Sequence, residues 1–366
     1  MITIIVVVLL LLAVIGTLVL AQRASDRKPL SSAPMGPAWV GRLLPTDPTH
    51  AFVTAVVVAA LLGVALALLG LYGSARSRYG WTIFVVTPFA VGFVSAALTT
   101  YRQEPTPWRF VRAGALAAVT AGLGFFTMGA EGLVCLLMAL PITVPCAIVG
   151  ALVAFLVQAR RQAMPTVLGA IICLVPLGLI IEPSLPDAPP AHTVRSAIEI
   201  DAPPTVVWAH LIEFEPIAAP LDSWFFRAGV AYPISAALNG HGVGAVRVCD
   251  FSTGRFVETI RVWDEGRELM FTVDEAPPAL EEWTPYKHVH PAHLTGYLVA
   301  ESADFRLAML PGGRTRLEGT SVYRNHMWPS SYWELWSEAI VTQIHRRVFE
   351  HVRHLAERES ARRQIP

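Results

Sequence analysis

The two halves of the chain differ in their pattern of apolar and polar positions. Up to residue 182, long apolar runs are separated by short polar loops. A helix needs roughly 20 apolar residues to cross about 30 Å of hydrocarbon. The pattern predicts six such spans, Thr3–Leu20, Ala51–Leu71, Trp81–Thr99, Ala113–Met128, Gly132–Val157 and Val167–Ile181.

Glu131 decides how the fourth and fifth spans are divided. A carboxylate inside hydrocarbon is costly, so we place Glu131 in a short loop between two spans. If this region were one span instead, the count would be five and the C-terminal half would lie on the other side of the membrane. The spans carry almost no ionisable side chains, which favours an anchor or scaffold over a transporter.

Basic residues in the loops predict the orientation of the spans. Nine Lys and Arg residues follow the first, third and fifth spans, whereas the alternate loops offer only Arg76 and Arg78. Loops rich in Lys and Arg stay in the cytoplasm. The chain is therefore expected to be a multi-pass protein of the cytoplasmic (inner) membrane, with its C-terminal domain on the outer or periplasmic side. Because basic residues follow the first span rather than precede it, an uncleaved anchor is favoured over a signal peptide.

A proline-rich stretch separates the two halves. Four prolines fall within residues 182–192, and such a segment can neither continue a helix nor enter a central strand. We expect a transmembrane domain at residues 1–182, a linker at 183–192, a folded domain at 193–358 and a charged tail at 359–366.

The second half shows the alternation of a water-soluble α+β domain. Thr193–Ile200 reads as a strand, and Asp201 is placed to cap the helix that follows. After an irregular stretch over 215–244, alternating segments predict the strands Ala245–Phe251, Arg255–Trp263, Arg267–Asp274, Tyr297–Leu310 and Arg314–Arg324. An apolar stripe at helical spacing predicts one long helix from Ser330 to Glu357. A curved antiparallel sheet wrapped around that helix is the expected architecture.

Three segments of this half carry a family resemblance. They read SAIEIDAPPTVVWAHLIEFEPI, GVGAVRVCDFSTGRFVETI and PGGRTRLEGTSVYR…YWELWSEAIVTQIHRRVFEHV. Together they resemble the START-like helix-grip superfamily, in particular its polyketide cyclase/dehydrase-like branch, called SRPBCC. The resemblance covers about Val194 to Glu357 and none of the membrane half. It implies a cavity between sheet and long helix, which in most members binds lipids or other hydrophobic small molecules; a few members are cyclases, hydrolases or receptors.

The hairpin over residues 245–263 holds the most specific polar pattern. With Thr253 and Gly254 as its turn, Arg247 and Glu258 become diagonal neighbours on a mostly apolar face. Because unpaired buried charges are prohibitive, these two side chains should pair. They would either anchor a ligand headgroup on a cavity wall or form a structural ion pair.

The expected cavity suggests further candidate residues. The side chains predicted to contact a ligand are Arg247, Phe256, Glu258, Tyr323, Trp333, Trp336 and Ile340. His345 lies at the margin of the apolar stripe, where a satisfied core histidine is favoured over a catalytic base. The aromatic residues of Trp224–Phe226 would either dock to lipid or cover the opening of the sheet.

A histidine cluster offers weak candidates for a metal site. His288, His290 and His293 form the run KHVHPAH, but no certain fourth ligand accompanies them. A solvated loop at the cavity mouth is the alternative. We therefore predict neither a metal nor a cofactor.

Composition and motifs narrow the function. Lys plus Arg and Asp plus Glu both number 28, so net charge gives no reason to expect a nucleic-acid partner. No nucleophile or phosphate-loop motif is present. We expect a membrane-anchored protein whose outward START-like domain binds a lipid or other hydrophobic small molecule. The alternatives are a cyclase- or hydrolase-type enzyme using the same cavity and a structural or assembly protein without a ligand. Protein partners remain open.

Overall fold

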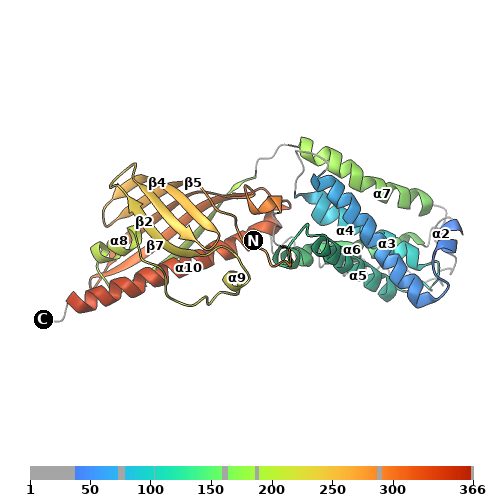
Figure 1. Ribbon diagram of the computed structural model, residues 1–366, viewed down its shortest axis with the longest axis horizontal. Helices are drawn as coiled ribbons and strands as arrows, with labels where there is room; N and C mark the ends of the chain where they lie inside the picture. Colours follow the sequence, from blue (N-terminus) through green and yellow to red (C-terminus); the bar gives the residue numbers. More distant parts are fainter. Residues whose placement is uncertain are drawn as a thin grey trace. The chain divides into compact units, whose positions relative to one another are not determined.

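The computed structural model describes residues 38–72, 79–102, 104–158, 164–185, 189–286 and 291–363. The chain divides into two compact units (Figure 1). The helical unit comprises Met1–Asp187 with two later segments, Thr284–Pro291 and Met327–Tyr332. The sheet unit comprises Ala188–Trp283, Ala292–His326 and Trp333–Pro366.

The helical unit contains helices that could cross a membrane. Its elements in order are α2 (Ala38–Leu43), α3 (Pro48–Tyr72), the π-helical turn η1 (Thr82–Val86), α4 (Thr87–Thr99), α5 (Pro107–Thr127), α6 (Leu133–Gln158), α7 (Met164–Ile181) and the 3-10 turn η3 (Glu182–Ser184). Within the described residues, four stretches are long and apolar enough to span: Pro48–Leu71, Thr82–Thr99, Pro107–Thr127 and Leu133–Gln158.

The predicted count of six spans is not confirmed. The first expected span, Thr3–Leu20, lies outside the described residues. The sixth, Val167–Ile181, corresponds to a shorter apolar helix, Leu168–Ser184, whose length falls below that of the other four. Four spans are therefore supported among the described residues.

The division at Glu131 is confirmed. Helix α5 ends at Thr127 and α6 begins at Leu133, so Glu131 lies in the link between them. Its carboxylate is buried and accepts a hydrogen bond from the Tyr79 hydroxyl at 2.6 Å. A buried carboxylate needs such a donor, because leaving it unsatisfied would cost several kcal/mol.

Glycines let two helices of this unit approach closely. A Cβ atom on Gly92 of α4 would lie 1.9 Å from the Ala147 carbonyl oxygen of α6. A Cβ atom on Gly150 of α6 would lie 2.0 Å from the Phe89 carbonyl oxygen of α4. Small residues that bring backbones together are typical of helix pairs in membranes.

The loops at one end of the helical unit are tied together. Arg102, which follows α4, donates from Nη2 to the Gly41 carbonyl oxygen at 2.7 Å and from Nε to that of Pro45 at 3.1 Å. The basic loops before α3 and after α4 therefore share one end, as antiparallel spans require.

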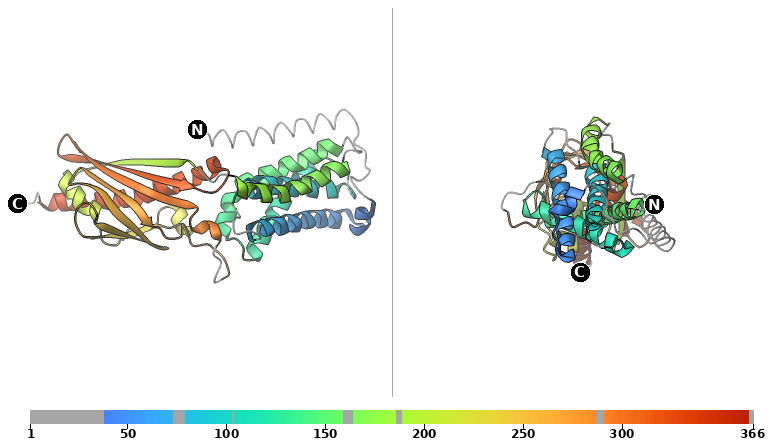
Figure 2. Two further views of the ribbon diagram at one scale, coloured as in Figure 1. Left: turned by 90° about the horizontal axis from the view of Figure 1, so that it is seen from above. Right: turned by 90° about the vertical axis from the view of Figure 1, so that its right-hand side faces the viewer.

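The sheet unit holds one antiparallel sheet and one long helix (Figures 1 and 2). Its seven strands lie in the order β1-β7-β6-β5-β4-β3-β2. They are β1 (Ala191–Ile200), β2 (Pro233–Asn239), β3 (Val246–Phe251), β4 (Gly254–Asp264), β5 (Glu268–Glu275), β6 (Leu298–Leu310) and β7 (Arg314–Asn325). The helical elements are α8 (Pro204–Ile212), α9 (Trp224–Arg227), the 3-10 turn η4 (Ala292–Leu294) and α10 (Ser330–Arg363). This is the curved antiparallel sheet with a long C-terminal helix that the sequence predicts.

Both ends of the unit extend beyond the predicted elements. Strand β1 begins at Ala191, inside the stretch expected as linker, because its first residues pair with β7. Helix α10 continues to Arg363, through the expected charged tail. An Arg363–Glu359 pair one turn apart and a His210–Glu359 contact at 2.8 Å stabilise its last turns.

Two local expectations at the start of the unit are wrong. Asp201 does not cap α8, which begins after Pro203; the Asp201 backbone amide instead donates to Glu357 at 3.1 Å. The stretch expected to be irregular contains β2 and the short α9. Strand β2 is not predicted from the sequence because its run PISAALN begins with proline and is rich in small residues, which are weak strand signals.

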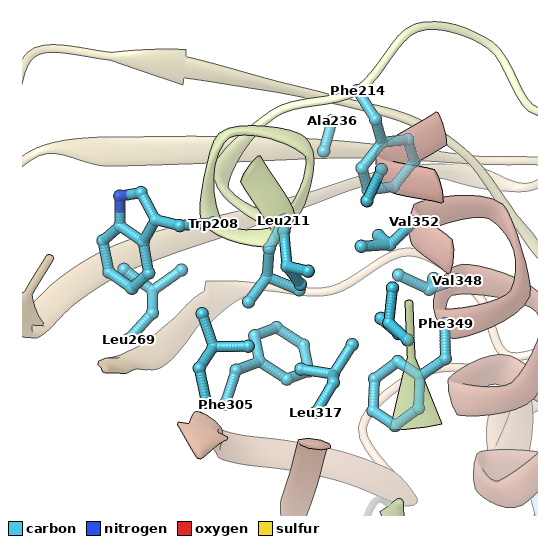
Figure 3. Packing of buried hydrophobic residues seen from close by; sticks show 14 of the residues in the cluster. Trp208, Leu211, Phe214, Ala236, Leu269, Phe305, Leu317, Val348, Phe349 and Val352 are labelled. Carbon is cyan, nitrogen blue, oxygen red and sulfur yellow. The ribbon is translucent and has the colours of Figure 1, made fainter. Parts of the chain in front are cut away.

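The core of this unit fills the space between the sheet, α8 and α10 (Figure 3). Buried side chains come from α8, from all seven strands and from α10, and they include Trp208, Leu211, Ala236, Leu269, Phe305, Leu317, Val348, Phe349 and Val352. Gly319 of β7 leaves room for this packing, because a Cβ atom there would lie 2.4 Å from Cζ of Phe349. Sheet and helix are thereby held in direct contact at one end of their shared face.

Candidate ligand-binding site

A cavity of about 160 Å³ lies between the sheet and α10 and is bordered by part of the packed core, including Phe305, Val348 and Phe349. Most of its lining is apolar, with Phe256 and Phe271 on the sheet side and Ile340, Ile344 and Val348 on α10. Five ionisable side chains also line it, Arg247, Cys249, Glu258, Tyr323 and His345. Their hydrogen-bonding states decide what the cavity can hold.

The β3–β4 hairpin brings Arg247 and Glu258 together, in a register that differs from the predicted one. The turn is Ser252-Thr253, so Arg247 pairs directly with Glu258 and not diagonally. This register also places Asp250 opposite Arg255, and their side chains meet at 2.9 Å. Opposite charges on both faces thus favour it over the predicted alignment. The slip involves an even number of residues, so the predicted face is retained.

Groups of the protein itself satisfy the Arg247–Glu258 ion pair. Arg247 Nη1 lies 2.5 Å from Glu258 Oε2, and Nε donates to the Ile212 carbonyl oxygen at 3.0 Å. The guanidinium also lies over the rings of Phe214 and Phe271, 5.9 and 5.5 Å from their centroids. Burial raises the pKa of the Glu258 carboxyl, and the charge of Arg247 opposes that rise. The pair therefore presents no unbalanced charge to a ligand.

His345 is also satisfied, as predicted. Its Nε2 lies 2.7 Å from the Ser321 hydroxyl and its Nδ1 3.0 Å from that of Ser196, and the ring stacks on Phe349. Burial lowers the pKa of His345 to about 4, so the ring is neutral at pH 7. With a pKa of about 4, His345 is a weak base at pH 7.

Cys249 is in an unreactive form. Burial raises the pKa of its thiol to about 12, so the thiolate is scarce at pH 7. Since the thiolate is the nucleophilic form, this residue lines the cavity as a small apolar group.

Tyr323 differs from these groups. Its side chain is 2% exposed, and its hydroxyl has no hydrogen-bond partner among the described residues. Burial raises the pKa of this hydroxyl, and the carboxylates of Glu334 and Glu338 raise it further. The group therefore remains protonated and able to donate.

The cross-strand neighbour of Tyr323 shares this property. His192 pairs with Tyr323 in the β1–β7 ladder, and their ring centroids lie 5.6 Å apart. Glu334 of α10 holds His192 Nδ1 at 2.9 Å, whereas the buried Nε2 has no partner within the described structure. Tyr323 and His192 thus each have a buried polar atom without a hydrogen bond in the described structure, and of the two residues Tyr323 lines the cavity.

The predicted ligand contacts divide into two groups. Arg247, Phe256, Glu258, Tyr323 and Ile340 line the cavity. The tryptophans Trp333 and Trp336, at the start of α10, lie outside its lining, and Trp336 packs edge-on against Phe225 of α9.

Helical spacing alone could not separate these groups, because the tryptophans continue the same stripe and α9 was not predicted to cover them. Sequence reasoning also missed Phe271 as a lining residue, although its alternate position in β5 was a usable signal.

The remaining candidates have mixed outcomes. His288 and His290 lie outside the described residues, so the proposed histidine cluster stays untested. His293 is buried in η4, where burial lowers its pKa to about 4. In α9, Phe225 and Phe226 are buried, as a cover over the sheet requires, whereas Trp224 is 53% exposed and stacks on Phe225.

The sequence matches no protein-family model, and no curated protein matches it. Solved structures resemble the C-terminal half. A protein from Nitrosospira multiformis is 17% identical and covers 46% of this chain and 99% of its own, with a TM-score of 0.31. Norcoclaurine synthase from Thalictrum flavum is 10% identical and covers 47% of this chain and 96% of its own, with a TM-score of 0.30. Similarity this low carries no information about function.

Proposed function

We propose that the sheet unit binds a hydrophobic small molecule in the cavity beneath α10 and that the apolar helices hold it at a membrane. The observation that carries this proposal is the cavity itself. A mainly apolar space lies between sheet and helix, and protein partners satisfy the charges in its wall. Ligand sites are characteristically apolar cavities with a few placed polar groups.

The volume limits the class of ligand. At about 160 Å³ the cavity is close to an engineered cavity of about 150 Å³ that holds benzene in another protein. It is smaller than the roughly 300–1,000 Å³ of typical drug-sized sites. A monocyclic molecule, or the end of one acyl chain, fits this space. A whole lipid would require α10 and the sheet to separate.

An enzyme of cyclase or hydrolase type would use the same cavity. Such chemistry needs a base or nucleophile in a reactive form. Burial lowers the pKa of His345 to about 4, which makes it a weak base at pH 7, and the Cys249 thiol is protonated at that pH. Among the described residues of the cavity, these observations favour binding over catalysis.

The binding test uses the full chain in detergent micelles. Native mass spectrometry followed by organic extraction should find a small apolar molecule bound to the wild type. Ile344→Trp places a large ring in the cavity and should abolish retention. Leu335→Trp is the matched control, because Leu335 lies on the same helix, is exposed and does not line the cavity. Equal retention by the two variants would refute binding in this cavity.

We also propose that the sheet unit lies outside the cytoplasmic membrane and that the basic loops of the helical unit lie in the cytoplasm. The excess of Lys and Arg in alternate loops supports this orientation. Cysteines introduced at the exposed positions Glu265 and Glu104 test it in intact cells. A membrane-impermeant maleimide should label Glu265→Cys before permeabilisation and Glu104→Cys only afterwards. The reverse pattern would invert the orientation.

A further inference from the structure

The polar inventory of the cavity specifies the chemistry of its ligand more closely than the apolar lining does. Arg247 and Glu258 neutralise each other, and His345 is neutral with both nitrogens engaged. Among the side chains that line the cavity in the described structure, Tyr323 is the one with a buried polar atom lacking a partner.

An unsatisfied buried hydroxyl is itself unfavourable. Burying such a group without a hydrogen bond leaves its lost hydration uncompensated, so native proteins keep few of them. A ligand that supplies one oxygen atom would remove this penalty on binding. An apolar ligand of the same shape would leave it in place.

Charge excludes two classes of ligand. A carboxylate in this cavity would need an unpaired cation, but the buried Arg247 is already neutralised, and Glu334 and Glu338 lie on the Tyr323 side. An ammonium group would need an unpaired carboxylate in the lining, but Glu258, the one carboxylate among the described lining residues, is held by Arg247. Uncompensated charge in such a site is prohibitive.

We propose that the cavity selects a small uncharged molecule with one hydrogen-bonding oxygen on an apolar body, and that the Tyr323 hydroxyl donates a hydrogen bond to this oxygen. A cyclic or aryl ketone and a short-chain alcohol are representatives of this class. The inference rests on the proposed binding function and deepens it. Tyr323 is thereby assigned as the specificity-determining residue of the site.

Shape-matched probes separate this proposal from simple apolar binding. Acetophenone and α-methylstyrene differ only in a carbonyl oxygen replaced by a methylene group. Benzoate and benzylamine are of similar size and are charged at pH 7. Ligand-detected NMR on the full chain in detergent micelles measures each affinity for wild type, Tyr323→Phe and Ile344→Trp. Because its cavity is filled, the Ile344→Trp variant measures the background signal from probe that partitions into the micelles.

The expected result is a carbonyl-dependent effect of Tyr323. The wild type should bind acetophenone about 5- to 10-fold more tightly than Tyr323→Phe does, the worth of one hydrogen bond to a buried group. Affinity for α-methylstyrene should be unchanged or higher in Tyr323→Phe. Neither charged probe should bind above the Ile344→Trp background.

Other outcomes overturn specific parts. If Tyr323→Phe leaves both neutral affinities unchanged while Ile344→Trp abolishes them, the binding function survives and the role of Tyr323 is refuted. Tighter binding of benzoate or benzylamine than of acetophenone would refute selection for a neutral ligand. If no probe binds wild type above the Ile344→Trp background, the proposed binding function fails, and the inference fails with it.

Discussion

The two sides of the cavity differ in the hydrogen bonding of one polar group, the Tyr323 hydroxyl. On the β3–β4 side, Arg247 and Glu258 are buried with a carboxylate, a backbone carbonyl and two aromatic rings as their partners. On the β7 side, Ser321 is hydrogen-bonded to His345, whereas the Tyr323 hydroxyl is buried without a hydrogen bond among the described residues. Both sides belong to one continuous sheet, so burial alone does not explain the difference.

This difference separates a structural site from a recognition site. Removing one partner of a buried ion pair costs much stability because the other charge is left unpaired, and a fully partnered pair has little left to offer a ligand. An unpartnered buried hydroxyl lowers stability in the empty protein, but it gains a hydrogen bond when a suitable ligand enters. A buried charge is therefore a poorer guide to the binding group here than an unsatisfied neutral oxygen.

The largest expected effect comes from breaking the ion pair. Glu258→Gln leaves the Arg247 guanidinium buried without a counter-charge, which should lower the free energy of unfolding by about 3–5 kcal/mol. Adding Arg247→Met removes the unpaired guanidinium and should restore most of the lost free energy of unfolding. Pulse proteolysis in urea on the full chain in micelles measures both changes.

Asp250→Asn provides the control on the same hairpin. It disrupts the Asp250–Arg255 contact, whose side chains are largely exposed, and should cost less than about 1 kcal/mol. If Glu258→Gln costs as little as Asp250→Asn, the ion pair does not hold this side of the cavity together.

A change of pH tests the neutral ring of His345, which is hydrogen-bonded to Ser321 of β7 and Ser196 of β1. Because the folded pKa of His345 is about 4 and its ordinary value is 6.5, the unfolded chain takes up a proton first as pH falls. Stability should therefore be constant above pH 6.5 and decrease towards pH 4, by about 3 kcal/mol from this residue. Buried His293 adds a loss of the same sign.

The contribution of His345 is isolated by comparing variants across that pH range. His345→Gln retains a side chain that can hydrogen-bond Ser196 and Ser321 but cannot titrate. Its stability should fall less steeply between pH 6.5 and 4 than that of the wild type, whereas a variant of exposed His354 should follow the wild type. Parallel curves for wild type and His345→Gln would contradict the assignment of a buried neutral ring.

The sequence predicts most of the architecture of the sheet unit because its elements have clear periodicity. The hairpins β3–β4 and β6–β7 and the long helix lie within a few residues of the predicted segments. Alternation also identified the face on which Arg247 and Glu258 meet. Their register was not predictable from the turn residues alone, since cross-strand pairs such as Asp250–Arg255 also contribute to it.

The binding group was less accessible to sequence reasoning. Tyr323 was among the predicted contacts, but its importance comes from what it lacks, and a missing partner cannot be seen in a sequence. The same limitation applies to Trp333 and Trp336, whose apolar spacing predicts that they line the cavity. In the structure, Trp336 packs against Phe225 of α9 instead. Local pattern identifies faces, whereas the contents of a cavity depend on every element around it.

The smallest expected effect has the opposite sign to the others. Tyr323→Phe removes an unsatisfied buried hydroxyl while retaining the ring against His192, so stability should be unchanged or rise by up to about 1 kcal/mol. Ser321→Ala, two residues earlier on the same strand, removes a partner of His345 and should cost about 1–2 kcal/mol. Urea-dependent proteolysis without added ligand compares the two variants directly. A loss of more than about 1 kcal/mol in Tyr323→Phe would mean that the hydroxyl is already satisfied in the empty protein. The two sides of the cavity would then be alike, and a ligand oxygen would gain no advantage at Tyr323.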